Sequence, residues 1–304
     1  MKDPDIAAIR EFLAGNKFPQ ETAALRLAYD DFGKVFPTPA DVTLEKVSAN
    51  GVPAEWSAAP NAAKDRVILY LHGGGYVIGS VASHRHVVAE LGRAAGTRTL
   101  ALDYRLAPEH PFPAAVDDAL AGYRFLLAQG FTPGNIAIAG DSAGGGLTVA
   151  TLLAIKAAGL EQPACGFCIS PWVDLEAIGN SMTTQAARDP MVQKKGLLGM
   201  AGAYLNGSNA RAPLAAPIYG DLTGIAPLLI QVGAAETLLD DSIRLASVAG
   251  AADVEVNLQV WPEMIHVWHF FHPMLGAARQ ALKVAGETIA RAMDRSVPTR
   301  QVAE

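Results

Sequence analysis

Six short apolar segments, separated by stretches with helical periodicity, constrain the fold of this chain more than any other feature. The apolar segments are residues 67–71, 99–102, 136–139, 165–169, 228–232 and 254–260. Amphipathic helices are predicted between most of them, at 86–95, 115–129, 143–158 and 238–249, with a final helix near 275–293. Strands that alternate with helices of this length predict a mostly parallel sheet covered by helices on both faces, so the fold class is α/β.

Two regions depart from this alternation. The first forty residues have helical spacing, and Asn50-Gly51 then joins two short alternating runs into a predicted hairpin. Between Trp172 and Pro227 a long interval contains a helical stretch but no apolar strand, which is typical of a functional insertion. We therefore predict a helical cap made of residues 1–40 and 176–212, and a catalytic core made of residues 41–175 and 213–304.

Charge and hydropathy exclude several classes of protein. Lys and Arg number 24 against 30 Asp and Glu, and the resulting net charge of −6 argues against nucleic acid as a partner. The sequence has no apolar run of the roughly 18 residues that a membrane span needs. The first residues carry acids instead of the apolar segment of a secretory signal, so we expect a soluble protein in the cytoplasm.

The two cysteines, Cys165 and Cys168, have the spacing of a redox pair or of half a zinc site. They fall in a predicted strand, where residues three apart point to opposite faces. We expect buried, unreactive thiols.

The segment Gly140-Asp141-Ser142-Ala143-Gly144 carries the chemistry. It follows a predicted strand and opens a predicted helix, which is the setting that gives the pattern G-x-S-x-G its meaning. The sharp turn exposes the hydroxyl of Ser142 at a helix N-terminus, where negative charge is favoured. We interpret Ser142 as a nucleophile; the alternative is a serine that only caps the helix.

A second glycine-rich segment, His72-Gly73-Gly74-Gly75, follows the strand at 67–71. Glycines leave backbone N–H groups free to face a site, as the tetrahedral intermediate of acyl transfer requires. We assign the oxyanion hole to the N–H groups of Gly74, Gly75 and Ala143. A phosphate-binding loop is the alternative, but the sequence lacks the accompanying lysine or distant acid. His72 is expected to form structural hydrogen bonds.

The general base should follow the last strand, because the order in such folds is nucleophile, acid, histidine. His266 is the first histidine after that strand. His269 and His272 have the spacing of a metal-binding face, but no acids lie near them in the sequence, so no metal is expected and both are placed on the surface that faces the cap.

The acid should lie just beyond the strand at 228–232. Glu236 occupies that loop, whereas Thr237 and Asp240 have the spacing of a capping box that would place Asp240 and Asp241 in the first helical turn. Glu236 is the predicted acid, and Asp240 is the alternative.

These residues resemble the hormone-sensitive-lipase family of α/β-hydrolases, the bacterial type IV esterases. The resemblance is carried by His72–Gly75, by Asp103–Glu109 with the prolines that follow, by Gly140–Gly144 and by His266 in its loop. It implies an α/β-hydrolase fold with a helical cap, no cofactor, and a structural role for the charged residues of Asp103–Glu109. Many members carry Asp-Pro-Leu in the acid loop, where this chain has Glu236-Thr237-Leu238. Within the family the chain looks most like small esterases of the monoterpene ε-lactone hydrolase type.

The predicted function is that of a carboxylesterase in which Ser142, His266 and Glu236 form a triad and the reaction passes through an acyl-enzyme. The resemblance implies esters with short acyl chains. Lactone or amide hydrolysis at the same site remains open, and a non-catalytic small-molecule receptor is the alternative from another class. A homodimer through the last strand and final helix is also considered. Apolar cap residues offered for substrate contact are Phe32, Phe36, Met182, Met191, Leu198, Tyr204 and Leu205.

Overall fold

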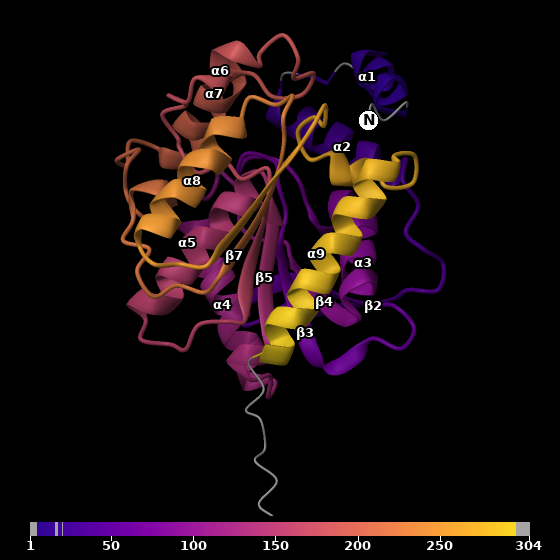
Figure 1. The fold of residues 1–304 in the computed structure, drawn as a ribbon, viewed down its shortest axis with the longest axis vertical. Coiled ribbons are helices and arrows are strands. Elements are labelled where there is room, and N and C mark those ends of the chain that lie inside the picture. Colours follow the sequence, from indigo (N-terminus) through magenta and orange to yellow (C-terminus); the bar gives the residue numbers. More distant parts are fainter. Residues whose placement is uncertain (1–4, 16–17, 20, 296–304) are drawn as a thin grey trace, which may run out of the picture.

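The structure is a computed structural model that describes residues 5–15, 18–19 and 21–295 (Figure 1). Residues 1–4, 16, 17 and 20 of the predicted cap, and residues 296–304 of the predicted core, lie outside the described residues.

A twisted sheet forms the centre of the molecule. In the described residues it has eight strands in the order β1-β2-β4-β3-β5-β6-β7-β8. The strands are β1 (Thr43–Ala49), β2 (Val52–Ala58), β3 (Ala63–Leu71), β4 (Thr97–Leu102), β5 (Ile136–Asp141), β6 (Cys165–Ile169), β7 (Leu228–Gly233) and β8 (Val256–Trp261). From β4 to β8 all neighbours pair in parallel, whereas β2 pairs antiparallel with β1 and β4. The predicted parallel sheet is confirmed, and its strands have nearly the predicted bounds.

The predicted hairpin forms between β1 and β2, with Ala49 opposite Val52. Asn50 and Gly51 have φ angles of 52° and 94°, the left-handed conformation that a two-residue hairpin turn requires at both positions. The Asn-Gly pair therefore sets the register of this edge of the sheet.

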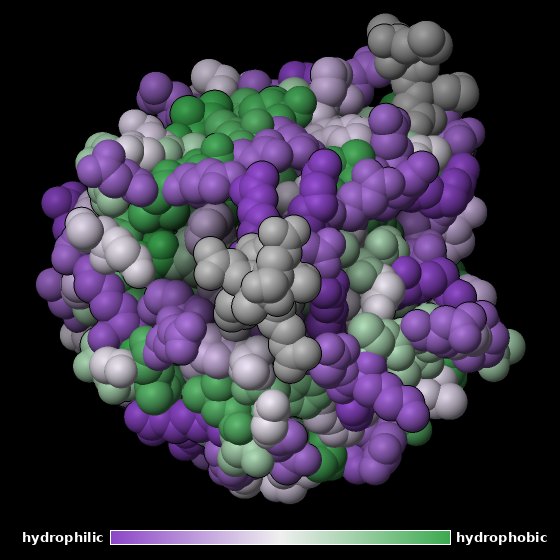
Figure 2. All heavy atoms as spheres, turned by 60° about the horizontal axis from the view of Figure 1, so that its bottom comes forward, coloured by the Kyte–Doolittle hydropathy of each residue, from purple (hydrophilic) through white to green (hydrophobic). Residues whose placement is uncertain are grey.

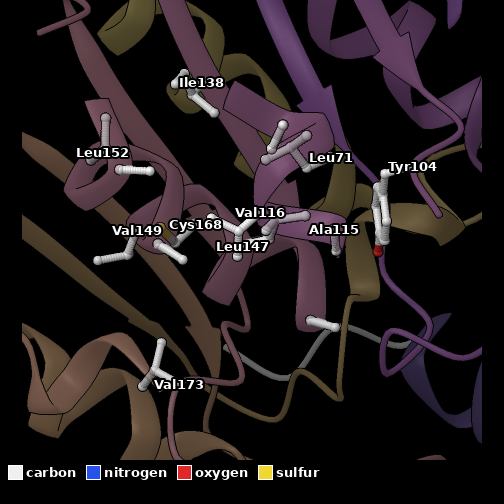
Figure 3. Close-up of a cluster of buried hydrophobic side chains, with 14 of the residues drawn as sticks. Leu71, Tyr104, Ala115, Val116, Ile138, Leu147, Val149, Leu152, Cys168 and Val173 are labelled. Atoms are coloured by element: carbon white, nitrogen blue, oxygen red, sulfur yellow. The ribbon is translucent and has the colours of Figure 1, made fainter. Parts of the chain in front are cut away.

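Helices cover both faces of the sheet because side chains of successive strand residues point to opposite sides. One buried cluster joins Leu71, Ile138 and Cys168 to α4 (Ala114–Ala128) and α5 (Ala143–Ala157), and Figure 3 shows this packing. The other cluster joins the alternate strand residues, including Cys165, to α3 (Val81–Ala95) and α9 (Gly276–Arg295). The two cysteines are thus buried on opposite faces, as predicted, and burial raises the pKa of the Cys165 thiol to about 12.

The remaining helices lie mainly at one end of the molecule. Figure 1 shows α1 (Asp5–Gly15), α2 (Thr22–Lys34), α6 (Ser181–Thr184) and α7 (Lys194–Leu205) above the carboxyl ends of the parallel strands. Helix α8 (Leu239–Ala251) packs against β7 and β8. Figure 2 shows the opposite end, where hydrophilic side chains alternate with smaller apolar areas. Within the described residues, no helix combines the length and apolarity needed to cross a bilayer. The division into cap and core, and a homodimer at the β8 edge, stay predictions.

Candidate active site

Ser142 occupies the sharp turn between β5 and α5. Its backbone has φ 53° and ψ −119°, a strained conformation for a residue with a side chain. The turn needs glycines around it, since a Cβ on Gly144 would lie 1.9 Å from the carbonyl oxygen of Leu71. Hydrogen bonds also hold the backbone of Ser142 in place. Its N–H donates to the Ile169 carbonyl, and its own carbonyl accepts the N–H groups of Gly146 and Trp172. The predicted strand–turn–helix context of the serine is confirmed.

The glycine-rich loop after β3 lies against this turn. Gly74 and Gly75 have φ angles of 115° and 63°, which residues with side chains rarely adopt. Ala143 is the first residue of α5, so its N–H has no partner within the helix. The Ser142 turn and the glycine loop therefore bring candidate donors to the same region.

A cavity of about 160 Å³ lies between the sheet and the α2 and α7 segments. Ser142, His266, Gly74 and Gly75 all line it. The other lining residues are mostly apolar: Tyr29, Phe32, Ile78, Asp141, Met191, Val192, Gln193, Gly196, Leu197, Met200, Val267, Phe270 and Phe271. The serine and the histidine predicted from separate parts of the chain thus line the same, mostly apolar cavity.

His266 lies in the loop after β8 and contacts Glu236 from the loop after β7. Its Nδ1 is 2.7 Å from Glu236 Oε2, and both side chains are buried. Burial disfavours the imidazolium, but the hydrogen bond to Glu236 and the charge of that carboxylate outweigh it, so the pKa of His266 is raised above its usual value. The pair is arranged so that the Nε2 of His266 is the ring nitrogen left for other partners.

Asp240, the alternative acid, has other partners. Its Oδ2 accepts the N–H of Ser181 in α6 at 3.1 Å. Asp240 and Asp241 do lie in the first turn of α8, but the predicted capping box does not form, because α8 begins at Leu239 and Leu238 is its N-cap residue. Thr237 instead donates from its N–H and its hydroxyl to Asp189 of the segment before α7. The partner of Thr237 is therefore Asp189, which is distant in the sequence, and not the nearby Asp240 of the predicted capping box.

Two buried polar groups around the site were not predicted. Asp141 accepts hydrogen bonds from the Tyr70 hydroxyl and the Gly73 N–H, so it connects the serine turn to the glycine loop. Ser170 donates to Glu236 at 2.8 Å. Asp141 is the last residue of β5, and Ser170 directly follows β6. Their position at the carboxyl ends of predicted parallel strands was the sequence signal that could have identified them as residues near the site.

Three further histidines named in the sequence analysis, His72, His269 and His272, are structural. His72 lies with its Nδ1 2.8 Å from the Gly73 carbonyl oxygen and stacks on Tyr104, as expected for a hydrogen-bonding residue. The placement of His269 and His272 on the cap-facing surface is wrong. Both are buried, His269 against Gln231 at 2.7 Å and His272 against His86 at 3.2 Å, because η3 (Trp268–Phe271) turns into the core beside α9.

Among the apolar cap residues offered for substrate contact, Phe32 and Met191 line the cavity. Phe36, Met182, Tyr204 and Leu205 are instead buried in core packing, and Leu198 is exposed. The loop Asp103–Glu109 has the expected structural role: Asp103 accepts the Val81 N–H, Arg105 pairs with Asp118, and Glu109 pairs with Arg26 of α2.

A family model described as the alpha/beta hydrolase fold matches residues 68–270. An acetyl-hydrolase of Streptomyces hygroscopicus is 48% identical over 94% of this chain and 96% of its own. The solved structure of an esterase from the bacterial hormone-sensitive lipase family, also 48% identical, superposes with a TM-score of 0.94 over 96% of this chain and 99% of that one. The chain belongs to the hormone-sensitive-lipase family of α/β-hydrolases.

This hydrolase also superposes on the crystal structure of EstE5 soaked with p-nitrophenyl butyrate. That chain is 44% identical, and the TM-score is 0.93 over 96% of this chain and 100% of that one. The predicted fold and family are therefore confirmed, and the protein is an enzyme of the carboxylic ester hydrolase class. The narrower likeness to ε-lactone hydrolases stays a prediction.

Proposed function

We propose that this hydrolase cleaves small, uncharged carboxylic esters with short acyl chains through a Ser142–His266–Glu236 triad. The observation that carries the proposal is the buried contact of 2.7 Å between His266 and Glu236 beside a cavity that Ser142 also lines.

His266 acts as the general base in the first half-reaction. Its Nε2 takes the proton of Ser142 while the serine oxygen attacks the ester carbonyl carbon. Glu236 accepts the hydrogen bond from Nδ1–H, which selects the tautomer with a free Nε2 and stabilises the imidazolium that forms. The same imidazolium then donates its proton to the leaving alcohol.

The carbonyl oxygen becomes negatively charged in the tetrahedral intermediate. We assign its stabilisation to the N–H groups of Gly74, Gly75 and Ala143, because two of these residues line the cavity and the third follows Ser142 at the start of α5. In the second half-reaction His266 activates a water molecule, which hydrolyses the acyl-enzyme through the same oxyanion site.

The cavity supports the substrate class. At about 160 Å³ it is small, and the described residues that line it include no lysine or arginine to pair with a charged acyl group. Met200 of α7 lines this small cavity and lies against the glycine loop, since a Cβ on Gly75 would lie 2.1 Å from the Met200 sulfur. We propose that the segments around α2 and α7 act as the cap and limit the length of the acyl chain.

Ser142→Ala tests the proposal with p-nitrophenyl acetate as substrate. Removal of a nucleophile from such a triad lowers kcat by about 10⁶-fold, so turnover should fall to background while circular dichroism shows an intact fold. A matched series from acetate to octanoate esters, with a lactone and an anilide beside it, defines the acyl group and the leaving group. Stoichiometric labelling of the wild-type enzyme, but not of the variant, by a fluorophosphonate distinguishes the enzyme from a receptor.

A further inference from the structure

Ser170 is the first residue after β6. It contacts the proposed acid, Glu236, and the residue that follows the proposed base, His266. It is fully buried, and its N–H donates to the Gln231 carbonyl of β7 at 2.7 Å. Its φ of 45° is unusual for a residue with a side chain. Strained positions of this kind persist where the surrounding structure holds them, and they concentrate at functional sites.

The hydroxyl of Ser170 touches both loops of the proposed triad. It donates to Glu236 Oε1 at 2.8 Å and accepts the N–H of Val267 at 3.2 Å. A hydroxyl has one proton, and the Val267 N–H occupies one of its lone pairs. Because the carboxylate can only accept, the Ser170 proton must point to Glu236.

This arrangement fixes the roles of the two carboxylate oxygens. Oε1 of Glu236 receives the Ser170 hydroxyl and the Gly233 N–H, and Oε2 is left to His266. The two donors compensate for the removal of the carboxylate from water. They also prevent rotation of the carboxyl group away from the imidazole.

We propose that Ser170 is a positioning residue that keeps Glu236 and His266 of this hydrolase at hydrogen-bonding distance from each other. The hydroxyl ties Glu236 to Val267, the residue that follows His266, so one side chain sets the distance between the β7 and β8 loops. This inference rests on the proposed function, since it assumes that Glu236 acts on His266.

The chain offers a matched control in Ser181 of α6. Its hydroxyl is also buried, donates to the Thr237 carbonyl and accepts the Asp240 N–H at 3.0 Å. Like Ser170, it therefore donates one hydrogen bond and accepts one from a backbone N–H, but its acceptor is a neutral carbonyl instead of a carboxylate. It contacts neither Glu236 nor His266 through these bonds. A purely structural role for Ser170 predicts equal effects of Ser170→Ala and Ser181→Ala.

We expect Ser170→Ala to lower kcat for p-nitrophenyl acetate about 10- to 100-fold with KM nearly unchanged, the range for loss of one hydrogen bond to a charged group. Ser181→Ala should leave kcat within about threefold of the wild type. In the background of Glu236→Ala, Ser170→Ala should have little further effect on kcat, because its target is gone. Thermal unfolding of every variant separates these effects from loss of fold.

Ser170→Gly serves if Ser170→Ala does not fold, because glycine accepts the positive φ without strain and still removes the hydroxyl. A wild-type kcat in this variant would overturn the inference, as would equal losses in the Ser170 and Ser181 variants or the same Ser170 effect with and without Glu236. If Glu236→Ala itself retained wild-type kcat, the proposed triad would fail instead, so the two failures are distinguishable.

Discussion

Replacement of Glu236 by glutamine tests the proposed triad most directly, because it changes one charged oxygen and keeps the shape of the side chain. The carboxylate is fully buried and has three hydrogen-bond partners: Ser170, Gly233 and His266. A glutamine can keep its carbonyl oxygen toward Ser170 and Gly233. Its NH₂ group then faces the Nδ1 of His266.

An NH₂ donor at that position stabilises the wrong tautomer of the imidazole. Nδ1 must then accept, so the proton moves to Nε2, where the base needs a free lone pair. The corresponding acid-to-amide change in a Ser-His-Asp triad lowers kcat by about 10⁴-fold. At about 1.36 kcal/mol per factor of ten, this is about 5.4 kcal/mol of activation free energy.

The assay is steady-state hydrolysis of p-nitrophenyl acetate by Glu236→Gln and by Asp240→Asn, the same chemical change four residues later, in the first turn of α8. Asp240 contacts Ser181 instead of His266, so its variant should keep kcat within about threefold of the wild type. Thermal unfolding should show both variants folded. A Glu236→Gln enzyme with more than about a tenth of the wild-type kcat, or a larger loss at Asp240, would refute the assignment of the acid.

Three further predictions concern pH and stability. The acid limb of kcat/KM should have its midpoint above about 6.5, because the pKa of His266 is raised and only the neutral imidazole accepts a proton; a lower midpoint contradicts this. Burial, with a contribution from the charge of Asp174, raises the pKa of Asp241 to about 7, against opposing backbone N–H bonds. Because the pKa of Asp241 is raised in the folded state, this group stabilises the fold at low pH, and the stabilisation is lost as pH rises through about 7. Asp241→Asn should therefore show a smaller drop in Tm between about pH 5 and pH 8 than the wild type. Gly144→Ala should cost at least about 1–3 kcal/mol in urea unfolding, since its Cβ would meet the strand backbone, whereas Gly199→Ala, an open helical position, should stabilise by about 0.5–1 kcal/mol; equal effects contradict the packing argument.

Local chemistry explains why much of the fold was predictable. The apolar strands and amphipathic helices were found within a few residues of their bounds because side-chain periodicity differs between the two. The Asn50-Gly51 turn and the glycines around Ser142 were also predictable, since each satisfies a backbone requirement of its own segment. For the same reason Ser142 and the glycine loop could be named as candidates.

Contacts between distant segments could not be read in this way. Glu236, in the loop after β7, and Asp240, in the first turn of α8, are only four residues apart. Only the parallel register of β7 and β8 brings the loop of His266 against the first of them. The local capping rule for Thr237 was overridden by Asp189, 48 residues away in the chain. His269 and His272 look like surface residues in the sequence, but in the structure Gln231 of β7 packs against the first and His86 of α3 against the second.

The sequence by itself therefore determined the α/β fold class, the strand-to-helix turn at Ser142 and the residue types offered for acyl transfer. Only the tertiary structure decided which carboxylate forms the hydrogen bond to His266, and that Ser170 contacts both the loop after β7 and the loop after β8. The physical reason is that backbone conformation depends on near neighbours, whereas a hydrogen-bond partner depends on which strand ends the sheet brings together.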